Sequence, residues 1–188
     1  MSDRSAVFLD RDGTIIEDTG YIATPATVRL LPGVAHAISR LNRAGLPAIV
    51  VTNQSGIARG LFDEAAYLAT VRRLDELLLR AGARLDAHYH CPHHPDYSGP
   101  CECRKPGPLL YRRAAADYQL HLARSWWVGD RPRDVLPAEQ FSGQGVLLGE
   151  ADPDQLFGVA AGRFLLARNL SAAVDLILQP LPRRPRYD

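Results

Sequence analysis

The chain has 188 residues, of which 46% are hydrophobic and 23% charged, and its formal net charge at pH 7 is +1. These values are typical of one globular domain with a sizeable core, and they exclude a strong overall attraction to nucleic acid or to an acidic membrane surface. We find no apolar run of membrane-spanning length and no signal-peptide pattern, and therefore expect a cytosolic protein without nucleic-acid or membrane partners.

The hydrophobic pattern alternates between short strands and amphipathic helices along the chain. This alternation predicts an α/β fold with a single doubly wound, Rossmann-like parallel sheet and helices on both faces. Residues 1–179 would form this domain, and the Pro/Arg-rich residues 180–188 a tail. Strands are expected at 6–9, 48–51, 85–90, 126–128, 145–148 and 164–166, and helices between Gly33 and Gly45, between the N-cap Asp63 and Gly82, and at 109–120 and 172–178.

Two carboxylates, Asp10 and Asp12, stand where the first predicted strand ends. Ligands of open α/β sheets bind beyond the carboxyl ends of the strands, so both side chains would face that crevice. Neighbouring carboxylates repel each other, and a hard divalent cation such as Mg²⁺ relieves the repulsion. A carboxylate in this place can also act as a nucleophile. Taken alone, the pair is equally consistent with a solvated turn that ends at Gly13.

All three cysteines lie within thirteen residues, in the pattern Cys91-Pro92-His93-His94 followed by Cys101-Glu102-Cys103. Such a cluster indicates a metal site rather than disulfides. The C-x-H pair and the C-x-C pair together supply four ligands, which fits a closed, structural Zn²⁺ site. We expect His93 as the fourth ligand, although His94 competes with it. Free surface thiols are the alternative; the spacing and the lack of a following basic helix disfavour a nucleic-acid-binding zinc finger.

Lys105 is the only lysine among 22 basic residues. Its ammonium is a compact point charge, whereas the guanidinium of arginine is a planar fork, so we expect Lys105 to have a task that arginine cannot perform.

Polar residues follow three of the predicted strands: Asp10 and Asp12 the first, Thr52 the second and Asp130 the strand at 126–128. Lys105 precedes a predicted helix. This order resembles the haloacid-dehalogenase phosphohydrolase superfamily. The resemblance implies that Asp10 attacks phosphorus to form an aspartyl phosphate and that Asp12 is the general acid and base. It further implies that Thr52 and Lys105 hold the phosphoryl oxygens.

The same resemblance implies a Mg²⁺ site made by Asp10, Asp130 and the backbone carbonyl of Asp12. Asp134 would orient Lys105 or a metal-bound water. Helix capping is the alternative for Asp130 and Asp134.

A narrower resemblance is to the D-glycero-D-manno-heptose 1,7-bisphosphate 7-phosphatase family, a capless, histidinol-phosphatase-like branch with Mg²⁺ in the site and a structural Zn²⁺ loop. It is carried by residues 10–14, 18–21, 52–60 and 103–106 and by the Cys/His loop, which together extend over most of the chain. The resemblance implies a monomeric phosphomonoester hydrolase that acts on a sugar bisphosphate. The substrate-binding residues that it implies are Asp18, Thr19, Gly20, Tyr21, Asn53, Gln54, Ser55, Arg104 and Arg131.

The chain departs from this family at three places: Arg131 replaces the usual lysine, the run 105–110 lacks the usual order of proline and glycine, and the loop between His93 and Cys101 is short. These differences bear on which sugar phosphate is the substrate more than on the type of reaction. A histidinol-phosphate phosphatase is the first alternative, although residues 55–60 look unlike that branch. A non-catalytic phospho-ligand binding protein is the second, and the complete catalytic set argues against it.

Overall fold

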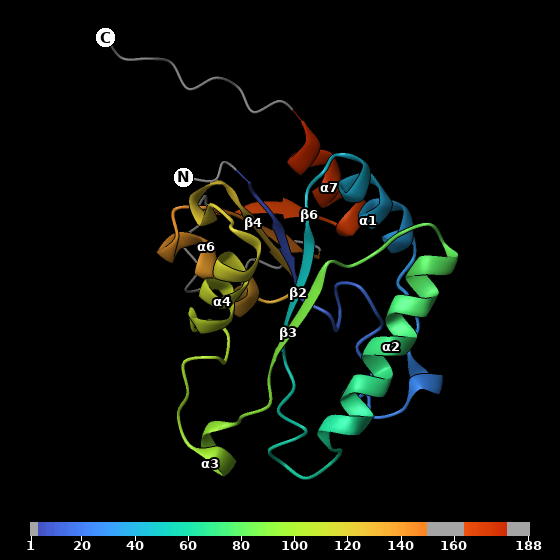
Figure 1. Ribbon diagram of the computed structural model, residues 1–188, viewed down its shortest axis with the longest axis vertical. Coiled ribbons are helices and arrows are strands. Elements are labelled where there is room, and N and C mark those ends of the chain that lie inside the picture. The colour runs from blue at the N-terminus through green and yellow to red at the C-terminus, as the bar shows by residue number, and fades with distance from the viewer. Residues whose placement is uncertain (1–3, 150–163, 180–188) are drawn as a thin grey trace.

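The strands form one parallel sheet in a computed structural model that describes residues 4–149 and 164–179. Its six strands lie in the order β3-β2-β1-β4-β5-β6, which confirms the predicted doubly wound fold (Figure 1). The predicted tail at 180–188 lies outside the described residues. The strands are β1 (Val7–Leu9), β2 (Ala48–Asn53), β3 (Ala87–Cys91), β4 (Trp126–Gly129), β5 (Gln144–Leu148) and β6 (Leu165–Ala167).

Four helices occupy the places that the sequence predicts, including one that begins after the N-cap Asp63, whose side chain accepts a hydrogen bond from the backbone of Ala66. Short elements were missed: the single-turn helices α3 (Pro95–Ser98), α5 (Pro132–Val135) and α6 (Pro137–Gln140), and the 3-10 turns η1 (Pro25–Thr27) and η2 (Leu122–Arg124). One turn shows no hydrophobic period, so only the initial prolines of α3, α5 and α6 signal them. The four longer helices are α1 (Val34–Arg43), α2 (Glu64–Arg80), α4 (Leu109–Tyr118) and α7 (Leu170–Leu178).

Two hydrophobic layers enclose the sheet because successive strand side chains point to opposite faces. Val7 and Leu9 of β1 pack with α1, α2 and α7, whereas Phe8 between them packs with α4 and α6 (Figure 1). With both faces covered, the central strands β1, β2 and β4 have polar side chains only at or beyond their carboxyl ends. No helix within the described ranges is both long and apolar enough to cross a membrane.

A sharp turn after β1 brings the first motif against β4. The amide of Asp10 donates to the carbonyl of Val128 (2.9 Å), so Asp10 continues the parallel ladder. Gly13 follows with a φ of +81°, and a Cβ atom built on it would lie 2.5 Å from Oδ2 of Asp130. Glycine is therefore required at position 13 both by the backbone conformation and by the approach of Asp130.

Gly13→Ala tests this approach against Gly45→Ala, since Gly45 has a similar φ of +72° but no atom within 4 Å of its missing Cβ. We expect Gly45→Ala to lower the free energy of unfolding by about 1 kcal/mol, through left-handed strain alone. Gly13→Ala should cost about 2–3 kcal/mol, because overpacking against Asp130 adds to the strain. Urea-induced unfolding measures both values, and equal losses would show that Asp130 moves aside without cost.

Candidate active site

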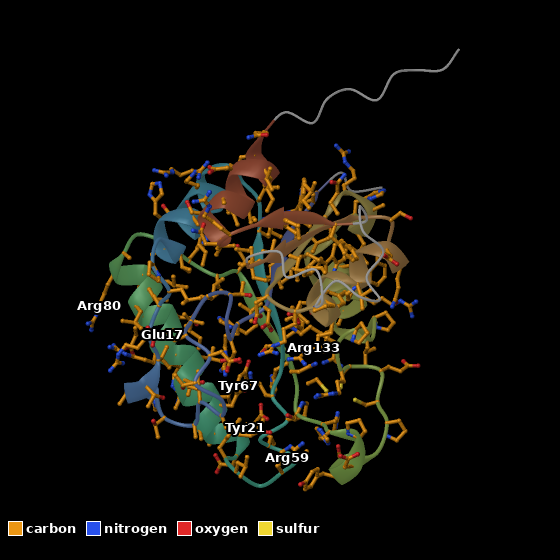
Figure 2. All side chains as sticks on the ribbon, turned by 180° about the vertical axis from the view of Figure 1, so that it is seen from behind. Glu17, Tyr21, Arg59, Tyr67, Arg80 and Arg133 are labelled. Carbon is orange, nitrogen blue, oxygen red and sulfur yellow. The ribbon has the colours of Figure 1, made fainter. Side chains whose placement is uncertain are left out.

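A cavity of about 330 Å³ opens at the carboxyl ends of the central strands. It collects side chains from the loops after β1, β2 and β4 and from the segment before α4, as expected for a parallel sheet of this topology. Tyr21 and Arg133, which line it, lie close to the strand ends in Figure 2. Its lining residues are Asp10, Asp12, Asp18, Gly20, Tyr21, Thr52, Asn53, Gln54, Ser55, Lys105, Arg131 and Arg133.

The cavity contains all four predicted catalytic residues and most of the predicted substrate-binding residues. Among the described residues, Thr19 and Arg104 are predicted contacts that do not line it. The guanidinium of Arg104 instead donates to the carbonyl of His93 (3.2 Å). Arg133 was missed by the sequence analysis; its only signal is its place two residues after Arg131 at the start of α5.

A buried ammonium links two carboxylates at the floor of this cavity. Lys105 is only 3% exposed; its Nζ donates to Oδ1 of Asp10 and lies 2.8 Å from Oδ1 of Asp134. Burial by itself would lower the pKa of Lys105, but the two carboxylates outweigh it and the pKa lies above its ordinary value. For Asp10, burial outweighs the nearby ammonium and raises the pKa to about 7. The prediction that Asp134 orients Lys105 agrees with this geometry.

The backbone of Lys105 is held by the side chain of Asn53. The amide of Lys105 donates to Oδ1 of Asn53 (2.9 Å), and Nδ2 of Asn53 donates back to the carbonyl of Lys105 (3.3 Å). Asn53, at the end of β2, therefore orients Lys105 in addition to lining the cavity. This pairing could not be predicted from the sequence, because it joins residues 52 positions apart.

Carboxylate oxygens of Asp10, Asp130 and Asp134 lie within 4.8 Å of one another and could hold a metal ion. Burial raises the pKa of Asp130, and its Oδ1 is buried without a hydrogen-bond partner among the described residues. Asp134 already faces Lys105 and accepts from the backbone amide of Arg131 (3.0 Å). Both oxygens of Asp134 are thus engaged, whereas Lys105 contacts only Oδ1 of Asp10. Asp10 and Asp130 are therefore the available oxygen donors, and this set suits a hard divalent cation such as Mg²⁺.

Asp12 faces a different cation, the guanidinium of Arg11. Nη2 of Arg11 lies 2.9 Å from Oδ1 of Asp12, and Nε lies 3.1 and 3.2 Å from its two oxygens. Nε2 of Gln54 donates to Oδ2 of Asp12 (2.9 Å) and to Oγ1 of Thr52 (2.9 Å). Sequence analysis missed Arg11, although a charged residue between two carboxylates at the end of a buried strand was a signal for it.

The sulfur atoms of the three cysteines and one ring nitrogen of His93 form a second cluster, with all four atoms within 4.8 Å of one another. The Sγ atom of Cys103 lies 3.0 Å from that of Cys91 and 3.1 Å from Nδ1 of His93. His94 is outside this cluster, and its Nε2 lies 2.9 Å from a guanidinium nitrogen of Arg59. Three sulfurs and one imidazole nitrogen, all free of disulfides, match the donors of a tetrahedral zinc site.

Comparison with known proteins finds relatives that are about 40% identical to the chain. The chain is 39% identical over 167 residues to the D-glycero-beta-D-manno-heptose-1,7-bisphosphate 7-phosphatase of Yersinia pestis, with 86% of this chain and 89% of the relative covered. It is 40% identical over 138 residues to the protein of that name from Escherichia coli K12, covering 71% and 72%. A profile for the family described as HAD-hydrolase-like matches residues 102–173.

Solved structures agree with this result. The crystal structure of D,D-heptose 1,7-bisphosphate phosphatase from B. bronchiseptica, complexed with magnesium and phosphate, superposes with a TM-score of 0.82 at 34% identity and covers 94% of this chain and 98% of that one.

A double-mutant cycle tests the buried charge pair. In the absence of divalent cations, Lys105→Met should lower the free energy of unfolding by about 3–5 kcal/mol, because it leaves buried carboxylates without a counter-charge. Combined with Asp134→Asn, it should cost at least about 1 kcal/mol less than the sum of the single changes.

The exposed pair Arg40–Asp175 provides the control, with 2.6 Å between Nη1 and Oδ1. Arg40→Met and Asp175→Asn should couple by less than about 1 kcal/mol, because water screens that pair. Urea-induced unfolding measures every variant; additive costs for Lys105 and Asp134 would contradict the interpretation.

Proposed function

Because the chain belongs to the D,D-heptose 1,7-bisphosphate phosphatase family of the haloacid-dehalogenase superfamily, we propose that it hydrolyses D-glycero-β-D-manno-heptose 1,7-bisphosphate at the 7-phosphate. The observation that carries this proposal is the meeting of Asp10, Asp12, Thr52 and Lys105 in one cavity. A nucleophile, an acid and two groups that bind phosphoryl oxygens are what a phosphatase of this type needs.

We assign each residue one part of the reaction. A carboxylate oxygen of Asp10 forms a bond to phosphorus while the bond from phosphorus to the C7 oxygen breaks, and that oxygen takes the proton of Asp12. Lys105 and Thr52 bind the phosphoryl oxygens, where negative charge is concentrated. Water then attacks the phosphorus of the aspartyl phosphate and gives a proton to Asp12. This attack breaks the bond between phosphorus and Asp10, releases inorganic phosphate and restores the carboxylate of Asp10.

Mg²⁺ fits the acidic group at the floor of the cavity. We propose that Asp10, Asp130 and the backbone carbonyl of Asp12 hold it. When bound, Mg²⁺ would compensate the charge of the carboxylates and of the phosphoryl group. The orphaned Oδ1 of Asp130 supports this assignment.

The second phosphate of the substrate requires positive charge away from Lys105. Arg131 and Arg133 line the same cavity and project from the start of α5. Nη2 of Arg131 lies 3.4 Å from Oδ2 of Asp18, whereas Arg133 is exposed and forms no ion pair with any residue the structure describes. We assign the second phosphate to these two arginines, whose planar forks suit phosphate oxygens.

The walls of the cavity would bind the sugar. Asp18, Gly20, Tyr21 and Ser55 line it and offer polar groups for hydroxyls. Thr19 and Arg104 stay predictions as substrate contacts.

We propose a structural Zn²⁺ bound by Cys91, Nδ1 of His93, Cys101 and Cys103. The cluster fixes the segment that ends two residues before Lys105, so zinc would hold the catalytic lysine indirectly. Free cysteines of this kind suit a reducing compartment, which supports a cytosolic location. The monomeric state stays a prediction.

The zinc assignment predicts different effects for substitutions of the adjacent residues His93 and His94. His93→Ala should abolish stoichiometric zinc, measured by elemental analysis, and should lower the free energy of unfolding by several kcal/mol, because metal binding is coupled to folding. His94→Ala is the matched control and should retain one zinc per chain. Retention of zinc by His93→Ala, or its loss only from His94→Ala, would contradict the ligand set.

Phosphate release from α- and β-heptose bisphosphate and from histidinol phosphate, with Mg²⁺ or with a chelator, tests the proposed reaction. We expect Mg²⁺-dependent turnover and a kcat/KM for the β-bisphosphate at least about 100-fold above that for histidinol phosphate, because unpaired buried polar groups penalise the wrong substrate. Asp10→Asn should be folded and inactive.

Preference for histidinol phosphate would favour the alternative phosphatase. Lack of turnover, together with failure of the protein to bind beryllofluoride at Asp10, would indicate a binding protein.

A further inference from the structure

Arg11 is a fully buried cation, and each of its three guanidinium nitrogens donates to a named partner. The residue is 1% exposed although it stands between two residues that line the cavity. Nη1 donates to Oγ1 of Thr70 (3.1 Å), and Nη2 donates to Oε1 of Gln54 (3.1 Å) as well as to Asp12. Burial of a guanidinium is costly unless it is paired and hydrogen-bonded, so this network holds Arg11 in one conformation.

Helix α2 anchors the guanidinium on the side away from the cavity. Thr70 belongs to this helix and donates its own hydroxyl to the carbonyl of Tyr67 (2.7 Å). The central carbon of the guanidinium lies 5.4 Å from the centre of the Tyr67 ring, in cation–π contact, and Tyr67 projects from α2 in Figure 2. Arg11 therefore connects a rigid 17-residue helix to the first catalytic loop.

The other side of Arg11 fixes the carboxylate of Asp12. The side chain of Asp12 is 18% exposed and lines the cavity, so one side of its carboxylate faces Arg11 and Gln54 while another remains accessible. A carboxylate offers about four lone-pair sites. Three N–H groups hold it: Nε of Arg11 is shared between both oxygens, Nη2 of Arg11 binds Oδ1 and Nε2 of Gln54 binds Oδ2. The proton that Asp12 must give and take is exchanged at the edge of the carboxylate that remains exposed to the cavity.

We propose that Arg11 is a positioning residue that orients the carboxylate of Asp12 for proton transfer. This inference rests on the proposed function only in that Asp12 is the general acid and base. Proton transfer depends on hydrogen-bond reach and alignment, and the planar fork of Arg11 fixes both the place and the plane of the carboxylate. Lysine could supply the charge in this position but not the fork.

The test compares leaving groups that do and do not require a proton. The sugar oxygen of heptose bisphosphate must be protonated as it leaves, whereas p-nitrophenolate departs as a stable anion. For both substrates kcat/KM reports on the steps up to departure of the leaving group, before water enters. The ratio of the two kcat/KM values does not depend on the fraction of folded enzyme, so it separates positioning from stability.

Arg11→Met should lower kcat/KM for heptose bisphosphate by about 30–100-fold, which is a large part of the usual contribution of a general acid. The same variant should lower kcat/KM for p-nitrophenyl phosphate by less than about threefold. Arg11→Lys should change the ratio of the two kcat/KM values in the same direction but by less. This variant replaces Arg11→Met in the test if Arg11→Met fails to fold. Arg40→Met is the matched control and should leave the ratio at the wild-type value, because Arg40 pairs with exposed Asp175 on α7.

Equal losses for both substrates in a folded Arg11 variant would overturn the proposal and make Arg11 a purely structural residue. The wild-type enzyme tests the proposed function by itself. If it prefers another alkyl phosphate, the heptose assignment fails, and the comparison of Arg11 variants is made with that alkyl phosphate instead.

Discussion

The buried ammonium of Lys105 is the interaction on which the site depends, since it neutralises carboxylates that come from two different parts of the sheet. Asp10 follows β1, and Asp134 belongs to α5 after β4. Without a cation between them these acids would repel each other in a place that water hardly reaches. Because Asn53 at the end of β2 binds the backbone of Lys105, three neighbouring strands are connected through this one residue. The packing of the sheet and the geometry of the cavity are thus coupled.

The Cys/His cluster that we propose as a zinc site extends this coupling to the loop after β2. The amide of Gln54 donates to the carbonyl of Cys91 (2.8 Å), and that of Ala58 to the carbonyl of Pro92 (3.1 Å). The segment that carries Gln54 therefore rests on the segment that carries the zinc ligands, while the end of the same cluster leads to Lys105. A closed metal site that takes no part in the chemistry can in this way fix groups that do.

The strands and the polar residues at their ends could be predicted from the sequence, because both have strong local signals. The contacts between those residues could not be predicted in this way. Strand β3 ends at Cys91, one residue later than predicted, because its pairing with β2 extends to Asn53. The bonds of Arg11 to Gln54 and Thr70 join residues 43 and 59 positions apart, and depend on side-chain conformations that only the packed fold selects. Local pattern predicts which groups meet at an edge, whereas tertiary packing decides which of them pair.

The two buried cations explain why two carboxylates in one loop have different chemistry. Asp10 faces Lys105, a point charge that is shared with Asp134. In the proposed reaction this charge can also be shared with phosphoryl oxygens, which leaves the carboxylate of Asp10 available for attack on phosphorus. Asp12 faces the fork of Arg11, which binds carboxylate oxygens in a fixed plane and also donates to Gln54 and Thr70. A second ammonium at position 11 would leave Asp12 free to turn, and a second fork at position 105 would not fit between two carboxylates that already lie close. In a chain that uses arginine for every other positive charge, the single lysine therefore stands where a compact charge is required.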